Sequence, residues 1–268
     1  MLIESEEAGV QLNLSELWKY RELLYLLTLR DIKVRYKQTL MGLAWVIIQP
    51  LTTMLIFTLV FNRFVRVDTG PMPYPLFALS GLLPWLFFAN AVTNSASSLV
   101  LNAHLITKVY FPRMYIPAAA VGTGLVDLAI SFVLLIVLAF YYGTVWTLSV
   151  LLLPVFILMM TLFAFGLGLV FASLTVKYRD LRHALPFIIQ IWMFASPVIY
   201  PASIVPEKWR WLLLINPIAV VLEGFRASFT GSSFNWPHIG VAAAIILTLF
   251  ILSLYIFRRA EDSFADVI

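Results

Sequence analysis

Apolar positions in this chain fall into six long runs that are separated by shorter polar connections. The runs lie near 39–61, 76–98, 115–141, 148–174, 184–200 and 239–257. A helix of about 20 apolar residues crosses the roughly 30 Å hydrocarbon core of a bilayer. The alternating pattern that is typical of barrel strands does not occur. The runs therefore predict an all-α integral membrane protein with six transmembrane helices.

A basic amphipathic segment over 14–37 leads into the first run. From Leu17 to Leu27, leucine and tyrosine recur every three or four residues, and charged residues occupy many of the other helical positions. Lys33, Arg35 and Lys37 then crowd the start of a long stretch without charge. This segment predicts an interfacial helix that lies on membrane lipids before the first span. A solvated helix of a soluble domain is disfavoured, because a soluble fold has no place for such a stretch directly behind it.

The connection 201–237, between the fifth and sixth runs, has an apolar part that could be mistaken for a further span. Asn216 and Pro217 divide this part, and they suit the cap and the first residue of a new helix. We therefore expect two short helices that enter the outer leaflet and return. A seventh span would place Arg258 and Arg259 outside, against the preference of Lys and Arg for the cytoplasmic side.

Charge is scarce and unevenly distributed. The chain is 62% hydrophobic and 12% charged, whereas ordinary soluble domains have about 25% charged residues. Only a few of the 18 Lys and Arg residues fall on the side opposite to the termini, namely Arg63, Arg66, Lys208, Arg210 and Arg226. Because connections rich in Lys and Arg stay in the cytoplasm, both termini are predicted to be cytoplasmic.

Residues that could perform catalysis or bind metal are sparse. The sequence contains no Gly-Lys pair, and therefore no Walker A loop for ATP. The histidines His104, His183 and His238 lack the spacing of metal ligands, and the chain has no cysteine. We predict neither a catalytic site nor a metal site in this chain.

Asp127 is the one acidic residue that falls clearly inside a predicted span. A carboxylate near the middle of a bilayer is costly unless it is protonated, paired or exposed to a wet cavity. Two hypotheses remain open. Asp127 either makes a structural hydrogen bond, to Ser131, Thr123 or another helix, or takes a direct part in transport.

Small residues recur at close spacing inside two of the runs. Gly122 and Gly124 lie in the third run, and Gly166 and Gly168 lie in the fourth. Small residues let helices approach closely within a membrane, so we expect these glycines to serve helix packing.

Aromatic residues make up 15% of the chain, and several lie inside spans rather than at their ends. An aromatic ring that faces a cavity would suit a sugar, whose C–H face stacks on the ring while its hydroxyls need polar partners. The candidates for lining a channel are Trp45, Phe57, Trp85, Phe88 and Trp192. A place in the core or in an interfacial belt remains the alternative for each of them.

The connection 101–113 is too short for a domain and too amphipathic for a plain turn. Leu105, Ile106, Val109, Tyr110 and Phe111 could form an exposed apolar face, and the proline that follows would end any helix. Such a face suggests a protein partner. A segment that lies on lipid is the alternative.

Three groups of residues form an ordered pattern along nearly the whole chain. They are Arg30-Asp31, Arg35-Tyr36, Gly42, Trp45 and Pro50; then Gly81, Pro84-Trp85, Phe88, Asn102, Leu105, Lys108, Phe111-Pro112-Arg113 and Pro117; then Tyr178-Arg179-Asp180, Ser196 to Tyr200, Asn216-Pro217 and Glu223 to Arg226. Together they resemble the membrane subunit of ABC-2 type exporters of polysaccharides.

The resemblance implies a single transmembrane domain over 1–268 that forms a homodimer around a polymer channel in the bacterial inner membrane. Two copies of a separate ATPase subunit would drive it and would bind ATP and Mg, so no cofactor and no nucleic acid are expected on this chain. Segment 101–113 would dock into the ATPase through Leu105, Lys108, Tyr110, Phe111 and Arg113. Segment 201–237 would form an outer gate with Asn216, Pro217, Glu223 and Arg226.

The implied substrate is a polysaccharide linked to undecaprenyl pyrophosphate, with O-antigen as the first candidate and teichoic acid or capsule polysaccharide as alternatives. A secondary transporter would need an ion-coupling site and repeated halves, and neither is visible. Arg30, Arg35 and Lys37 stand where a pyrophosphate head would arrive, so charge-assisted contact is reasonable. Anchoring of the helix on the cytoplasmic side is the alternative for each cation.

Overall fold

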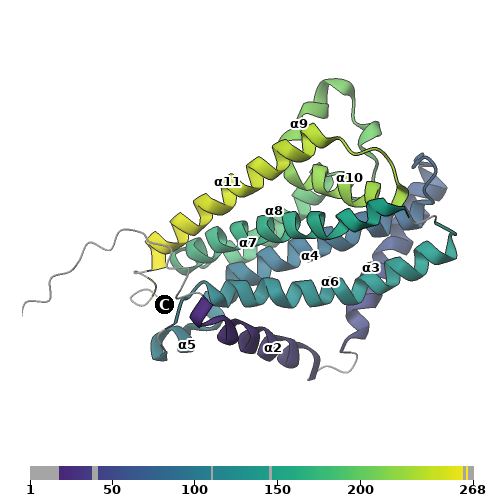
Figure 1. Ribbon diagram of the computed structural model, residues 1–268. Helices are drawn as coiled ribbons and strands as arrows, with labels where there is room; N and C mark the ends of the chain where they lie inside the picture. Colours follow the sequence, from purple (N-terminus) through teal and green to yellow (C-terminus); the bar gives the residue numbers. More distant parts are fainter. Residues whose placement is uncertain (1–17, 38–41, 110, 145–146, 262–263, 265–268) are drawn as a thin grey trace, which may run out of the picture.

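The protein is an all-α membrane protein. The computed structural model describes residues 18–37, 42–109, 111–144, 147–261 and 264, and these ranges contain helices and connections but no strand (Figure 1). The α-helices are α2 (Arg21–Lys37), α3 (Ala44–Phe57), α4 (Tyr74–Leu101), α5 (Ala103–Lys108), α6 (Tyr115–Tyr141), α7 (Leu153–Lys177), α8 (Leu181–Ala195), α9 (Arg210–Ile215), α10 (Pro217–Thr230) and α11 (Trp236–Glu261). The first residues of the predicted interfacial helix, 14–17, lie outside the described ranges.

Five helices are long and apolar enough to cross a membrane. They cover Ala44–Phe64, Tyr74–Leu101, Tyr115–Tyr141, Leu148–Lys177 and Trp236–Glu261. In the first of these, α3 passes directly into the π-helical turn Thr58–Phe64, and a 3₁₀ turn, Leu148–Leu152, precedes α7 in the fourth. These five segments confirm the corresponding apolar runs, although the first three residues predicted for the first span lie outside the described ranges.

The fifth predicted span is shorter than expected. We expected a helix near 184–200, but α8 ends at Ala195 and has 15 residues. A helix of that length is about 22 Å long, less than the roughly 30 Å of a hydrocarbon core. Ser196 is extended and precedes Pro197, and proline disfavours helical backbone in the residue before it. The helix of the fifth predicted run therefore begins three residues earlier and ends five residues earlier than the bounds 184–200.

The connection after α8 contains the two predicted short helices. The segments Glu207–Ile215 and Pro217–Thr230 meet at an angle of 94°. The side-chain oxygen of Asn216 accepts a hydrogen bond from the backbone N–H of Ile218 at 3.2 Å, and Pro217 is the first residue of α10. Asn216 and Pro217 thus begin a new helix, as predicted from their capping chemistry.

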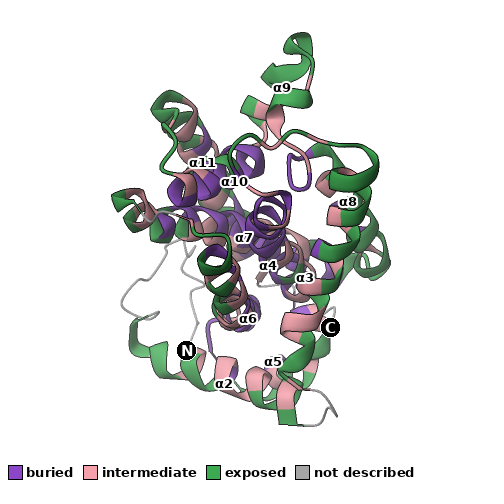
Figure 2. Ribbon diagram, turned by 90° about the vertical axis from the view of Figure 1, so that its right-hand side faces the viewer, coloured by how far each residue is buried: buried purple, intermediate pink, exposed green. Residues whose placement is uncertain are grey.

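Helices α4, α7 and α10 form the centre of the bundle, as the buried ribbons of Figure 2 show. Within the apolar window of each span, 78% of the α4 residues are buried inside the chain, against 11% for Ala44–Phe64. Helix α4 packs against both α6 and α7, and α7 also packs against α11. The segment Ala44–Phe64 and helix α8 are peripheral and expose most of their side chains.

Glycines at helix crossings allow these close contacts. A Cβ atom added to Gly168 would lie 2.7 Å from the Cβ of Ser95, and one added to Gly166 would lie 3.3 Å from the backbone of Phe250. At Gly122 and Gly124 the nearest side-chain atoms would be 3.1 and 3.3 Å away. The predicted packing role of these four glycines is confirmed.

Candidate functional site

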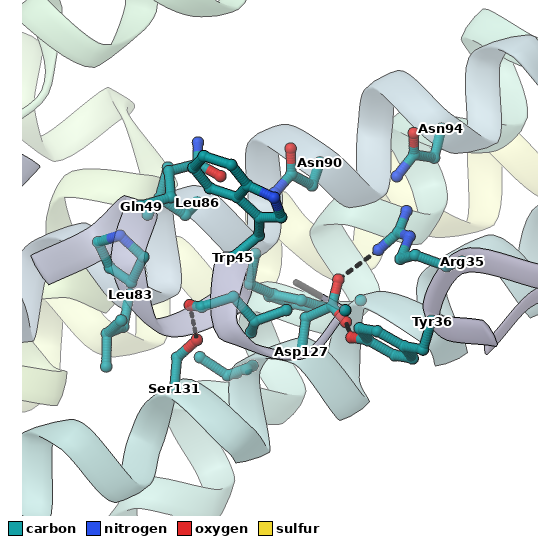
Figure 3. A pocket seen from close by; sticks show the side chains of 16 residues that line it. Arg35, Tyr36, Trp45, Gln49, Leu83, Leu86, Asn90, Asn94, Asp127 and Ser131 are labelled. Carbon is teal, nitrogen blue, oxygen red and sulfur yellow. Dashed lines mark hydrogen bonds and ion pairs between the residues drawn. The ribbon is translucent and has the colours of Figure 1, made fainter. Parts of the chain in front are cut away.

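A cavity of about 320 Å³ lies between α2, α3, α4 and α6 (Figure 3). It is lined by Arg35, Tyr36, Gly42, Trp45, Val46, Gln49, Pro50, Leu83, Leu86, Phe87, Asn90, Asn94, Gly124, Asp127, Leu128 and Ser131. The lining mixes polar groups with apolar side chains although three of its helices belong to membrane-spanning segments.

Three side-chain amides contribute to this cavity. Asn90 and Asn94 lie one helical turn apart on α4, and Gln49 lies on α3. Within the described part of the chain, no group donates a hydrogen bond to these amides or accepts one from them. Their hydrogen-bonding capacity is therefore open to the cavity.

The carboxylate of Asp127 joins α6 to α2. It forms an ion pair with Arg35 and accepts a hydrogen bond from the Tyr36 hydroxyl. The hypothesis of a bond to another helix is confirmed, whereas Ser131 and Thr123 are not its partners. Ser131 instead donates to the carbonyl oxygen of Val46 at 3.0 Å, and Thr123 donates to a carbonyl oxygen of its own helix.

The Tyr36 phenol is held in its protonated form. Burial, and after it the hydrogen bond to Asp127, raise the pKa of Tyr36 above its ordinary value, while the nearby Arg35 guanidinium lowers it by less. The phenol therefore donates its hydrogen bond throughout the neutral pH range.

The other cations of α2 differ in their partners. Arg30 forms an ion pair with Asp31 at 2.8 Å and donates to the side-chain oxygen of Asn102 at 2.9 Å, so it ties α2 to the end of α4. Lys37 is exposed. Of the three cations that could contact a pyrophosphate, Arg30 and Arg35 thus already have carboxylate partners, and contact with a pyrophosphate stays a prediction.

The candidate channel aromatics occupy different environments. Trp45 is 57% exposed and lines the cavity. Trp85 and Phe88 are buried in the core, which corrects their assignment to a channel wall. Trp192 packs edge-on against the Phe88 ring at 5.5 Å, and Phe57 is half-buried. Mid-span rings fill gaps between helices as readily as they face a cavity, and the sequence pattern does not distinguish the two.

The connection 101–113 is less exposed than its sequence suggested. Helix α5 ends at Lys108, and Ile106 and Phe111 are buried in a cluster that includes Leu27 of α2 and Phe257 of α11. The predicted exposed apolar face is wrong for Ile106 and Phe111. Leu105 is half-buried, Lys108 and Val109 are exposed, and Tyr110 lies outside the described residues.

Glu261, at the end of α11, holds this connection in place. Its carboxylate accepts a hydrogen bond from the backbone N–H of Arg113 at 2.9 Å, and the Arg113 side chain donates to the Glu261 carbonyl oxygen. Arg258 pairs with the same carboxylate at 3.3 Å. The connection before α6 is thereby tied to the last helix of the chain.

A second polar cluster joins α10 to the turn after α8. Arg226 is buried, although its sequence position predicted a cation on the outer side. It donates to the carbonyl oxygens of Pro197 and Val198 and lies over the Phe77 ring, 3.8 Å from its centroid. The Tyr74 hydroxyl donates to the carbonyl oxygen of Ile199 at 2.8 Å.

Asn216 extends this cluster. Its amide nitrogen donates to Ser196 at 2.8 Å, and its oxygen accepts from the indole N–H of Trp192 at 3.3 Å. Of the candidate gate residues, Asn216 and Arg226 therefore connect α8, α10 and α4. Pro217 begins α10, and Glu223 is exposed. Their role as a gate stays a prediction.

The described residues contain no group of three or more His, Cys, Asp or Glu side chains that could hold a metal ion.

Comparison with known families supplies the identity of the fold. A family model described as ABC-2 type transporter matches residues 22–230. The chain belongs to this family.

Relatives of this ABC-2 transporter chain have similar lengths. It is 34% identical to the O-antigen export system permease protein RfbA of Myxococcus xanthus, over 94% of this chain and 98% of the relative. It is 32% identical to a protein of the same name from Klebsiella pneumoniae, over 92% and 95%. It is 25% identical to the polysialic acid transport protein KpsM of Escherichia coli, over 88% and 93%.

Several residues of the sites in this ABC-2 transporter chain were not predicted from its sequence. Asn90, Asn94 and Gln49 lie in the cavity, and Glu261 ties the connection before α6. The four-residue spacing of Asn90 and Asn94 inside an apolar run was a usable signal, because it places two amides on one helix face. The contact made by Glu261 spans 148 positions in the chain, and the sequence carried no signal for it.

Proposed function

We propose that the chain is the membrane subunit of an ATP-driven exporter that moves lipid-linked polysaccharide from the cytoplasmic to the outer face of the inner membrane. The observation that carries the proposal is the match to proteins named O-antigen export system permeases over more than nine-tenths of both chains. O-antigen on undecaprenyl pyrophosphate is accordingly the first candidate substrate. Membrane-spanning helices around a cavity lined by side-chain amides are consistent with transport of a polar molecule.

The functional unit that we propose is a homodimer with two copies of a separate ATPase subunit. The chain lacks a Walker A loop, so ATP and Mg are assigned to the partner. The exposed side chains of α5 and of the residues that follow it, among them Lys108, provide the candidate docking surface. The exposed apolar side chains of α3 and α8 are candidates for contact with the second copy or with lipid.

Both termini face the cytoplasm in this proposal. Helices α2 and α5 and the last residues of α11 meet at one end of the bundle (Figure 1). Cations cluster there, including Arg30, Lys108 and Arg258, which is the pattern of a cytoplasmic surface. Labelling of a C-terminal tag from the outer face of intact cells would contradict this orientation.

The proposed function is tested by deletion and co-purification. Deletion of the gene should leave completed polysaccharide inside the cell, and the wild-type gene should restore export. A tagged chain should co-purify with an ATPase in equal amounts, and transport into vesicles should require ATP. Transport by the lone chain without ATP would contradict the proposal.

A capsule polysaccharide is the second candidate substrate. It is supported by the match to a protein named polysialic acid transport protein, at the lower identity of 25%. Chemical analysis of the polymer that accumulates in the deletion strain discriminates between the two substrates.

A further inference from the structure

We infer that the cavity between α2, α3, α4 and α6 binds uncharged sugar rings of the polymer through Asn90, Asn94 and Gln49, and that it does not bind the pyrophosphate. This inference rests on the proposed function and deepens it. The pyrophosphate and the sugar are chemically different ends of one substrate, and the geometry of the cavity distinguishes them.

The first argument is the free-energy cost of side-chain amides that have no hydrogen-bond partner inside a membrane span. Asn90 and Asn94 lie well within the 28 residues of α4, and both side chains face the cavity (Figure 3). Neither amide has a hydrogen-bond partner among the described residues. Polar groups in hydrocarbon are unfavourable unless they are paired or face a wet cavity. These amides are therefore placed to meet water or a polar ligand.

The second argument is charge. Among the described residues that line the cavity, Arg35 and Asp127 are the only formally charged ones, and they form an ion pair with each other. The lining therefore carries no net charge. A pyrophosphate needs cations that are not already neutralised, since charge-assisted contacts supply its affinity. An uncharged ligand fits this lining better.

The third argument is the match to hydroxyl groups. A side-chain amide offers two N–H donors and a carbonyl acceptor, and a sugar hydroxyl both donates and accepts. The indole of Trp45 is 57% exposed and stands among the amides in Figure 3. The apolar face of a sugar ring can pack on such an indole, while Leu83, Leu86 and Phe87 complete the apolar wall.

The fourth argument is size. The cavity holds about 320 Å³, at the small end of the roughly 300–1,000 Å³ of small-molecule sites. It therefore suits a short stretch of glycan rather than a long coil. Successive sugars would occupy it in turn while the polymer moves.

The test measures binding of the two ends of the substrate separately. The exporter is purified with its ATPase partner into lipid nanodiscs. One probe is the polysaccharide released from its lipid by mild acid, and the other is undecaprenyl pyrophosphate without sugar. The double variant Asn90→Ala/Asn94→Ala should weaken glycan binding by at least about tenfold, as expected for two lost hydrogen-bonding groups. Its binding of undecaprenyl pyrophosphate should not change.

Matched variants separate recognition from folding. Thr93→Ala removes a polar group from the same helix turn, but Thr93 does not line the cavity and bonds to its own helix, so glycan binding should stay at the wild-type level. Asn90→Gln/Asn94→Gln keeps both amides and should retain more glycan binding than the alanine pair. Retained co-purification with the ATPase shows that each variant is folded.

Two results would overturn the inference. Unchanged glycan binding by the alanine pair would show that the cavity holds water only. Loss of undecaprenyl pyrophosphate binding would show that the cavity recognises the lipid head. Failure of the proposed function looks different, because the wild-type complex itself would then fail to export polysaccharide.

Discussion

At the scale of single residues, Arg226 shows how a buried cation organises the backbone around it. Its guanidinium donates to the carbonyl oxygens of Pro197 and Val198, in the turn that ends α8, and covers the Phe77 ring. Gly81 leaves the space for this arrangement, because an added Cβ would overlap both Arg226 and Val198. A buried guanidinium that lost its acceptors would be strongly destabilising.

We expect Gly81→Ala to displace Arg226 from these carbonyl oxygens. Forcing extra atoms into a packed core costs about 1–3 kcal/mol, so the midpoint of thermal unfolding in detergent should fall. Gly240→Ala is the matched control. Gly240 also lies in a helix, but an added Cβ would meet nothing within 4 Å. Equal midpoints for the two variants would contradict the role assigned to the close contact at Gly81.

The ion pair between Arg35 and Asp127 gives a second prediction at this scale. Asp127→Asn leaves Arg35 without a counter-charge, and because the Arg35 side chain is 38% exposed the expected cost is about 1 kcal/mol. The single variants Asp127→Asn and Arg35→Gln should each lower the unfolding midpoint. The double variant should lose less than the sum, because neither charge is then left unpaired. Strictly additive losses would show that the pair contributes no coupling.

The sequence predicted part of the cavity at this scale. Three lining residues were candidates from the sequence, because the position of a cation, an indole or a carboxylate at a membrane requires a physical explanation. They are Arg35, Trp45 and Asp127. Gln49, Asn90 and Asn94 were not predicted, since amides in an apolar run resemble ordinary polar interruptions, and the spacing of Asn90 and Asn94 shows only that they share a helix face. Only the packing of α3 and α4 against α6 turns them toward one cavity.

At the scale of elements, hydropathy predicted five of the long helices well and α8 poorly. Length and apolar composition determine whether a segment can span a bilayer, so runs without internal breaks were reliable. Apolar residues continue beyond Ala195, but Pro197 stops the helix there. The contact of α2 with α6 was not predictable, because an amphipathic pattern shows that a face is apolar and not which helix covers it.

The contact between α2 and α6 can be locked to ask whether α2 moves during transport. A Cβ on Gly122 would lie 3.8 Å from the Cβ of Thr28, and the Cβ atoms of a disulfide are separated by about 3.8 Å. The chain has no cysteine of its own. Thr28→Cys/Gly122→Cys should therefore cross-link cleanly under oxidation, as seen by a mobility shift on gels.

We expect oxidation of this variant to stop export and reduction to restore it, because the cross-link prevents any movement of α2 relative to α6, the two helices that Asp127 joins through Arg35 and Tyr36 at the cavity. Each single cysteine variant is the control and should export under both conditions. Undiminished export by the cross-linked protein would show that α2 stays fixed to α6 throughout the cycle.

At the scale of the whole molecule, one end of the bundle gathers segments that are far apart in the chain. One buried cluster contains Leu27 of α2, Ile106 of α5, Phe111 of the connection before α6, and Phe257 of α11. Beside this cluster, Glu261 accepts a hydrogen bond from Arg113. A displacement of α5 by a partner would therefore reach α2, α6 and α11 together. In the proposed exporter, a conformational change of the ATPase would be transmitted to the membrane helices at this end of the bundle.

The bond between Glu261 and Arg113 is the part of this end that can be removed with least disturbance. Glu261→Ala takes the acceptor from the Arg113 backbone and the counter-charge from Arg258, while the apolar cluster remains. We expect the ATPase to bind and hydrolyse ATP, but the amount of polymer exported per ATP to fall by about fivefold, at the low end of coupling between sites. Export into vesicles and phosphate release measure the ratio.

Glu207→Ala, at an exposed residue before α9, should leave the ratio unchanged. An unchanged ratio in Glu261→Ala would show that the cluster alone transmits the movement, and loss of the ATPase from the complex would assign Glu261 to docking instead.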